Sequence, residues 1–378
     1  MAFLENPIYV LSMLALMVML AVYVERTSFG RPLGAALLAI VFTAIIANMG
    51  LIPSASNTIF LYEGIFTYVA PLSIFYLMLG VNLKAIKKAG LPMIGLFVLG
   101  SLATVVGILV AWHLISPEGV LGENGPIIAG MLTGTYTGGS VNFNAIALEY
   151  DFQKQGALYA GTIAVDNVVT TVWIVVTLAM PRILKKFWKD KKGTAPKNTE
   201  EHGQKDNGMD LNSLMWLLFL GLAAFFISEA LSKILPELPS ILTLTTLGVI
   251  LAQTPFVSKL NGAHTLGLYS VYLFLAVIGA YCEINAVLEL KTLGLTLFLF
   301  TATVVLIHGI TTILLGGLLY RDWSMIAIAS QANIGGGPTA LALAETFGRK
   351  ELMLPAILVG TLGNALGTYF GFLVIQFL

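Results

Sequence analysis

Apolar stretches of spanning length recur along the whole chain. About 20 consecutive apolar residues cross the hydrocarbon core of a bilayer as one α-helix, so the pattern predicts an all-α polytopic membrane protein. The first stretch follows a single acidic residue, Glu5, and lacks the basic start of a cleaved signal peptide, so we read it as a retained span. The stretches lie at residues 8–24, 33–52, 64–81, 91–115, 126–148, 157–180, 211–232, 238–252, 265–281, 293–319, 323–345 and 352–378.

One polar segment interrupts this pattern. Residues 182–210 hold eight Lys/Arg and five Asp/Glu and little that is apolar. A segment of that composition cannot bury a core of its own, so it is expected to be a linker. It divides the chain into two halves, 1–181 and 211–378, with six apolar runs in each.

Two of the apolar runs contain clustered glycines. The run at 126–148 includes Gly138 and Gly139, and the run at 323–345 includes Gly335–Gly337 followed by Pro338. Glycine lowers helix stability, and proline breaks a helix interior. Each run is therefore predicted to form two half-helices separated by a non-helical break.

The distribution of basic residues indicates whether these broken runs cross the membrane or turn back. If all the runs cross, the 20 Lys/Arg divide ten to ten between the two sides; if both broken runs turn back, seventeen lie on one side and three on the other. Lys and Arg concentrate in cytoplasmic loops. We therefore predict ten transmembrane spans plus two re-entrant hairpins, with the linker in the cytoplasm and both termini outside.

In this topology the two halves are inverted repeats, each with five spans and one hairpin. Secondary transporters often have this arrangement, with the binding site near the midplane between the repeats. Short similar sequences occur in the same order in both halves: Gly161-Thr162 and Gly360-Thr361 follow the two hairpins, and residues 80–86 resemble residues 279–287.

The two glycine breaks are the expected substrate site. Non-helical backbone at membrane depth is tolerated only where it is buried in protein or lines a wet cavity. The second half-helix of each hairpin would point its N-terminus inward, where free N–H groups favour an anion. The candidate substrate-binding residues are Thr135, Thr137, Gly138, Gly139, Ser140, Asn142, Asn144, Gln331, Asn333, Gly335, Gly336, Gly337 and Thr339.

Asp166 is the candidate for cation coupling. It lies near the middle of the 157–180 run and is followed by Asn167, while Asn364 stands at the matching place in the second half. A carboxylate inside a membrane is costly and marks a functional site by default. These three residues are expected to couple a cation, either Na⁺ at Asp166 and Asn167 or H⁺. His308 is expected to make a hydrogen bond between helices rather than to carry a proton.

Composition narrows the chemistry further. The chain has 378 residues, 57% hydrophobic and 11% charged, with a formal net charge of +0, so nothing suggests a nucleic-acid partner. A single cysteine excludes a disulfide within the chain and a Cys-based metal site. The phosphate-loop pattern GxxxxGK[ST] and the zinc pattern HExxH do not occur. We therefore expect neither an enzyme nor a bound cofactor, apart from the coupling ion.

The glycine motifs also carry a family resemblance. GTYTGGSVNFNA (134–145) and SQANIGGGPTALALAE (330–345), joined through a charged linker, resemble the bacterial and plastid membrane family called domain of unknown function 819. More distantly the chain is similar to sodium/glutamate symporters and 2-hydroxycarboxylate transporters. That resemblance implies a homodimer through a scaffold domain, an elevator-like movement of the hairpin domain, and Na⁺- or H⁺-coupled uptake of small anions.

Together these features predict a secondary transporter of the plasma membrane. We expect symport of a cation, Na⁺ or H⁺, with a small carboxylate-bearing solute such as an organic acid, amino acid or short acidic peptide. One alternative is a cation/proton antiporter that uses Asp166-Asn167. A channel and a non-transporting membrane protein are further alternatives.

Overall fold

The described part of the chain is built entirely from helices. The structure, a computed structural model, describes residues 4–28, 30, 34–190, 209–235, 238–282 and 291–378, and no strand occurs among them. The similarity noted between residues 80–86 and 279–287 therefore falls partly outside the described residues, and so do residues 191–208 of the linker.

Within the described residues, eight helical segments are long and apolar enough to cross a membrane. They confirm a multi-pass membrane protein. The remaining two predicted spans correspond to shorter apolar helices, α2 (Gly34–Asn48) and α12 (Ser240–Ala252). The eight are α1 (Pro7–Glu25), the segment Phe60–Met78 (α3, Phe60–Gly64; η2, Ile65–Val69; α4, Ala70–Met78), α6 (Leu91–Ile115), α10 (Gly156–Phe187), α11 (Leu211–Ile234), α13 (Ala263–Ala280), α15 (Lys291–Leu319) and α18 (Lys350–Phe377).

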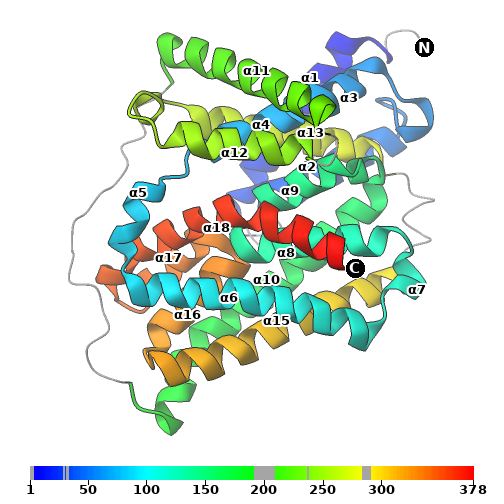
Figure 1. The fold of residues 1–378 in the computed structure, drawn as a ribbon. Coiled ribbons are helices and arrows are strands. Elements are labelled where there is room, and N and C mark those ends of the chain that lie inside the picture. Colours follow the sequence, from blue (N-terminus) through cyan, green and yellow to red (C-terminus); the bar gives the residue numbers. More distant parts are fainter. Residues whose placement is uncertain (1–3, 29, 31–33, 191–208, 236–237, 283–290) are drawn as a thin grey trace.

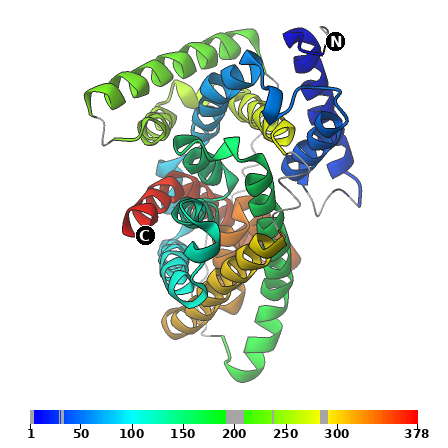
Figure 2. The ribbon, with the colours of Figure 1, turned by 90° about the vertical axis from the view of Figure 1, so that its right-hand side faces the viewer.

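The helices sort into two bundles, as Figures 1 and 2 show. The upper bundle of Figure 1 contains α1 to α4 and α11 to α13, with close packing of α13 on α2 and α4. The lower bundle contains the remaining described α-helices, with close packing of α18 on α8 and of α15 on α6. Each bundle takes helices from both halves of the sequence. The short helices of the lower bundle are α5 (Leu83–Ile86), α7 (Glu118–Leu121), α8 (Asn124–Gly138), α9 (Ser140–Glu149), α16 (Trp323–Ile334) and α17 (Gly336–Thr346).

Both glycine-rich runs are interrupted where the sequence predicts. α8 ends at Gly138, and Gly139 adopts φ +99° before α9 begins, a backbone conformation that glycine permits at little cost. In the second run, Gly336 has φ +78° at the start of α17. The two half-helices of each run touch each other: Asn142 and Ile146 fill the space beside Gly134, and Gln331 is hydrogen-bonded to Thr339.

α10 extends further than its apolar run. The helix continues to Phe187, so the first residues of the 182–210 segment are helical. The chain beyond it lies against the start of α16. The rings of Trp188 and Trp323 stack with centroids 5.9 Å apart, and the Trp323 indole N–H donates to the Trp188 carbonyl at 2.7 Å. The chain that follows α10 is therefore held against the N-terminal end of α16.

Candidate functional site

The first glycine break lies directly against α18. Three glycine pairs form an antiparallel seam between α8 and α18: Gly130 with Gly371, Gly134 with Gly367, and Gly138 with Gly363. A Cβ atom on Gly138 would lie 1.9 Å from the Gly363 carbonyl carbon, so backbone touches backbone there. Small residues at intervals of four allow such close approach of helices in membranes. We call these six residues the glycine seam.

The second break contacts the same turn of α18. A Cβ atom on Gly360 would lie 2.5 Å from the Gly337 Cα atom. Asn364, one turn further along, lies beside Gly139 of the first break, with its Oδ1 atom 3.8 Å from the position of a Cβ there. The two breaks, far apart in sequence, therefore meet at residues 360–364.

The predicted substrate residues of the first run differ in exposure. Ser140 is exposed, whereas Thr135 and Thr137 are buried, and the Thr137 hydroxyl finds no hydrogen-bond partner among the described residues. Asn142 is fully engaged with α18: its Oδ1 accepts from the Thr368 hydroxyl (2.7 Å) and N–H (3.1 Å), and its Nδ2 donates to the Gly363 carbonyl (3.3 Å). Asn144 accepts a hydrogen bond from the Tyr159 hydroxyl.

The predicted residues of the second run are held by side chains. Gln331 accepts from the Thr177 hydroxyl of α10 and donates to Thr339, both at 3.1 Å. Thr339 in turn donates to the Gly336 carbonyl at 3.0 Å. Asn333 is hydrogen-bonded to the Ser101 hydroxyl of α6 at 2.9 Å, and Gly100 leaves the room that its amide occupies.

His308 joins both runs in a buried hydrogen-bond network. Its Nδ1 lies 3.0 Å from the Gly100 carbonyl and from the Thr104 hydroxyl, and that hydroxyl donates to the Tyr136 carbonyl of α8 at 3.1 Å. Its Nε2 lies 2.9 Å from the Ser330 hydroxyl of α16. Because a carbonyl can only accept, the Nδ1 atom carries a proton in this arrangement. The expected hydrogen bond between helices is confirmed.

Asp166 lies beside the first run. The Thr170 hydroxyl donates to its Oδ1 at 3.2 Å. The hydroxyl of Tyr136, from α8, interacts electrostatically with the same carboxylate. Asn167 follows on the helix and is partly buried. Among the described residues, Asp166 and Asn364 share no hydrogen bond, and a joint coupling role of the three residues stays a prediction.

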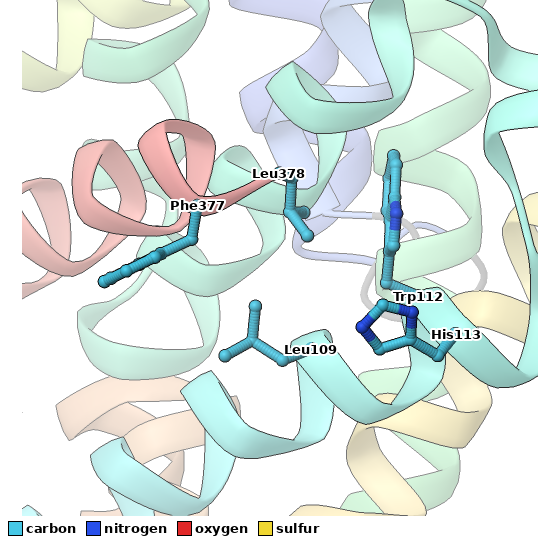
Figure 3. Close-up of a pocket in the computed structure, with 5 residues that line it drawn as sticks. All are labelled: Leu109, Trp112, His113, Phe377 and Leu378. Atoms are coloured by element: carbon cyan, nitrogen blue, oxygen red, sulfur yellow. The ribbon is translucent and has the colours of Figure 1, made fainter.

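A separate hollow lies at the far end of α6. Figure 3 shows it between α6 and the end of α18, with a volume of about 360 Å³. Its lining is mostly apolar, and no residue of the glycine motifs takes part. The lining residues are Leu109, Trp112, His113, Phe377 and Leu378.

Several residues of the site were missed by the sequence analysis. Ser101 and Thr104 lie on the largely apolar helix α6, and Thr177 lies on α10. Trp173, also on α10, donates its indole N–H to Ser330 at 3.1 Å. Their only signal is a polar atom at membrane depth. Gly363, Gly367 and Gly371 do carry a signal, since they repeat at intervals of four, as Gly130, Gly134 and Gly138 do.

Comparison with known proteins agrees with the resemblance of the glycine motifs. The model of the family described as protein of unknown function (DUF819) matches residues 10–378. The chain belongs to the DUF819 family. An uncharacterized membrane protein of Bacillus subtilis (strain 168), YjcL, is 28% identical over 370 residues, covering 92% of this chain and 90% of that protein. Membership in DUF819 and the eight apolar helices together establish a membrane protein.

Proposed function

We propose that the chain is a secondary active transporter that couples a cation to symport of a small carboxylate-bearing solute. The observation that carries this proposal is the meeting of both glycine breaks at residues 360–364 of α18. α9 and α17 begin at these breaks, so the free N–H groups of two helix starts face one region. A carboxylate is a ligand that such helix starts favour.

Asn364 and Ser140 are the side chains best placed to contact this solute. Asn364 is partly exposed beside Gly139 and makes no hydrogen bond to any described residue, and Ser140 is exposed at the first turn of α9. Asn364, expected from the sequence to couple a cation, is therefore reassigned to the anion in this proposal. Asn142 and Asn333 support the breaks, because their amides are already bonded within the protein.

Two matched hydrogen bonds support a description of the halves as repeats. The Asn48 amide, at the end of α2, donates to the Cys282 carbonyl after α13 at 2.8 Å. The Gln253 amide, at the end of α12, donates to the Val81 carbonyl after α4, also at 2.8 Å. Val81 and Cys282 lie in the two similar segments 80–86 and 279–287, shortly after the ends of α4 and α13. In each half, a side-chain amide at the end of one helix thus donates to a backbone carbonyl in the similar segment of the other half.

The separation into two bundles supports an elevator-like movement. The packing within each bundle is more extensive than the packing between them, where α9, α10 and α18 of the lower bundle touch α2, α4, α12 and α13. Both breaks belong to the lower bundle. In the proposed cycle this bundle carries solute and cation past the upper bundle, and the broken runs act as re-entrant hairpins of two inverted repeats.

Ligand-dependent thermal stability tests this function. We would measure the melting temperature of the purified protein in detergent with small carboxylates, amino acids and short acidic peptides, in Na⁺ or K⁺ at two pH values. A ligand that binds only the folded protein stabilises it by about 2.7 kcal/mol at a hundred times its Kd. We expect one carboxylate class to raise the melting temperature, and Asn364→Ala to abolish that rise.

Ser258→Ala is the matched control, because Ser258 lies in the short helix η5 (Val257–Lys259), outside the lower bundle. It should respond to the solute as the wild type does. A panel in which no carboxylate shifts the melt under any condition would contradict the proposal, as would an undiminished shift in the Asn364 variant. A melt that responds to cations alone would favour antiport instead.

A further inference from the structure

The surroundings of Asp166 bear on the identity of the coupling ion. The carboxylate has two neighbouring hydroxyls, from Thr170 on its own helix and from Tyr136 on α8. Tyr136 is completely buried, and its hydroxyl makes no hydrogen bond of acceptable geometry to any described group, although it interacts with Asp166. A buried hydroxyl without a partner is unfavourable. The Asp166 carboxyl is the neighbouring group that can serve as its partner.

The backbone around Asp166 offers little to a metal ion. Hard cations take about six oxygen ligands, and in transporters many of these are carbonyls released from broken helices. α10 is an uninterrupted helix from Gly156 to Phe187, so the carbonyls near Asp166 are used within it. The nearby carbonyl of Tyr136 already accepts from Thr104. Apart from Asn167, which follows Asp166 on the same helix, the oxygen ligands found beside this carboxylate in the described part of the chain are two hydroxyls. This set falls short of about six oxygen ligands.

No charged side chain in the described part of the chain interacts with Asp166, including those on the helices packed against α10. Among the described residues, Tyr136 is the only other titratable group that interacts with Asp166. An isolated carboxylate is costly to carry through a bilayer in its ionised form. A protonated carboxyl is neutral, and its O–H can donate to one hydroxyl while its other oxygen accepts from the second.

We propose that Asp166 is a proton-binding site completed by the hydroxyls of Tyr136 and Thr170, so that the coupling ion is H⁺ rather than Na⁺. In the ionised form both hydroxyls donate to the carboxylate. On protonation, the new carboxyl O–H donates to the Tyr136 hydroxyl oxygen. The hydrogen of the Tyr136 hydroxyl then turns away from the carboxyl. Thr170 continues to donate to the other carboxyl oxygen. The proposal rests on the transport function above, because only a carrier needs a coupling ion.

The location of Tyr136 connects this site to the first break. Tyr136 stands two residues before Gly138, at the end of α8, and Thr104 holds its carbonyl. Proton binding at Asp166 therefore acts on the half-helix that leads to the proposed solute site. Asp166 itself does not contact the solute in this arrangement.

Infrared spectroscopy of the purified protein tests the proposal without any solute. A pH titration, at constant ionic strength and in Na⁺ or choline, would follow the C=O stretching band of a protonated carboxylic acid. We expect a titrating band in the wild type that is lost in Asp166→Asn and insensitive to Na⁺. Tyr136→Phe and Thr170→Val should retain the band with a shifted midpoint. Glu63→Gln, which removes an exposed carboxylate of α3, is the control and should leave the band unchanged.

Two results would overturn the assignment. One is a band that persists unchanged in Asp166→Asn. The other is a melting temperature raised by Na⁺ but not by choline, with that rise lost in Asp166→Asn. If Asp166→Asn does not fold, the test uses Tyr136→Phe and Thr170→Val. A titration midpoint of the band equal to that of the wild type in both variants would then overturn the assignment. Because no solute is present, failure here is distinct from failure of the carboxylate panel.

Discussion

The two glycine-broken runs are similar in sequence but are held in place by different interactions. The first is fixed by backbone contact along the glycine seam with α18. The second run also touches the backbone of α18, where Gly337 meets Gly360. In addition it is held by side chains that belong to other helices, including Ser101, Thr177 and His308. Glycine therefore has two roles. At the glycine seam and at Gly337 it permits close approach of a helix, and at Gly335 it leaves room for polar side chains.

The two kinds of contact also differ in how far they can rearrange. The backbone contact of the glycine seam cannot change its geometry locally, whereas the side-chain hydrogen bonds of the second run can. A backbone crossing has one geometry, because neither helix can withdraw locally. A hydrogen-bond network of serine, threonine and amide groups can exchange partners, since each group has several donor or acceptor positions. If one run rearranges during transport, the second is better built for it.

Alanine substitution at one glycine in each run is the strongest way to test this comparison. Gly138→Ala would place a Cβ atom 1.9 Å from backbone, so we expect it to lower the free energy of unfolding by about 3 kcal/mol or more. Gly335→Ala would meet only the movable ends of Gln331 and Thr339, and about 1–2 kcal/mol should be lost with their hydrogen bonds. Thermal and denaturant unfolding in detergent would measure both.

Gly294→Ala is the matched control for these two variants. Gly294 lies in α15 with open space around it, so alanine there should be neutral or stabilise the helix by up to about 1 kcal/mol. Equal losses at Gly138 and Gly335 would refute the proposed difference between the runs.

A double-mutant cycle between Asn142 and Thr368 would measure how much the side-chain hydrogen bonds between α9 and α18 contribute beside the glycine seam. Asn142→Ala and Thr368→Ala each remove hydrogen bonds between α9 and α18, and we expect a coupling energy of about 1–2 kcal/mol. Both Thr368→Ala and Thr368→Val keep the backbone N–H donor and lose the hydroxyl donor. Thr368→Val also fills the volume of the threonine side chain, so it should lose less stability than Thr368→Ala. A coupling energy near zero would mean that the seam alone holds this run.

The smallest expected effect concerns the end of the first run. Glu149 accepts a hydrogen bond from the Ile241 N–H at the start of α12, which joins the two bundles. Burial raises the pKa of Glu149, an effect that the Ile241 bond opposes and the nearby Glu229 and Asp151 reinforce. The folded protein thus disfavours the ionised form of the Glu149 carboxyl. Below the pKa of this group in the unfolded chain, about 4.3, Glu149 does not lower the stability of the protein. As the pH rises through that value and above, Glu149 progressively destabilises the folded state.

Glu149→Gln should remove this slope while keeping an oxygen that can accept from Ile241. We expect the variant to match the wild type at low pH and to exceed its stability at neutral pH by less than about 1 kcal/mol. Melting curves over a pH series would show the difference, with Glu63→Gln as the control. A variant that is less stable at neutral pH would reverse the sign and reject the argument.

The sequence predicts the helices and their breaks better than it predicts partners. Clustered glycines locate both interruptions because backbone conformation is a local property. Asn142 shows what the sequence does not predict. Its side chain suits a helix start or a ligand site, yet in the structure it accepts a hydrogen bond from the Thr368 hydroxyl. Which helix a polar side chain faces depends on packing between distant segments, and no local pattern records that choice. For the same reason Trp173 and Ser101 went unnoticed, and the roles of Ser140 and Asn364 stay predictions.

The glycine seam also has a practical consequence for observing the molecule at work. Since α8 and α18 touch over three successive glycine pairs, they are expected to shift together as one piece. Phe377 lies at the far end of α18 with 71% of its surface exposed, while Cys282, the single cysteine of the chain, is buried. A fluorophore on Phe377→Cys would therefore report displacements of the first break from a distance, with no probe inside the site.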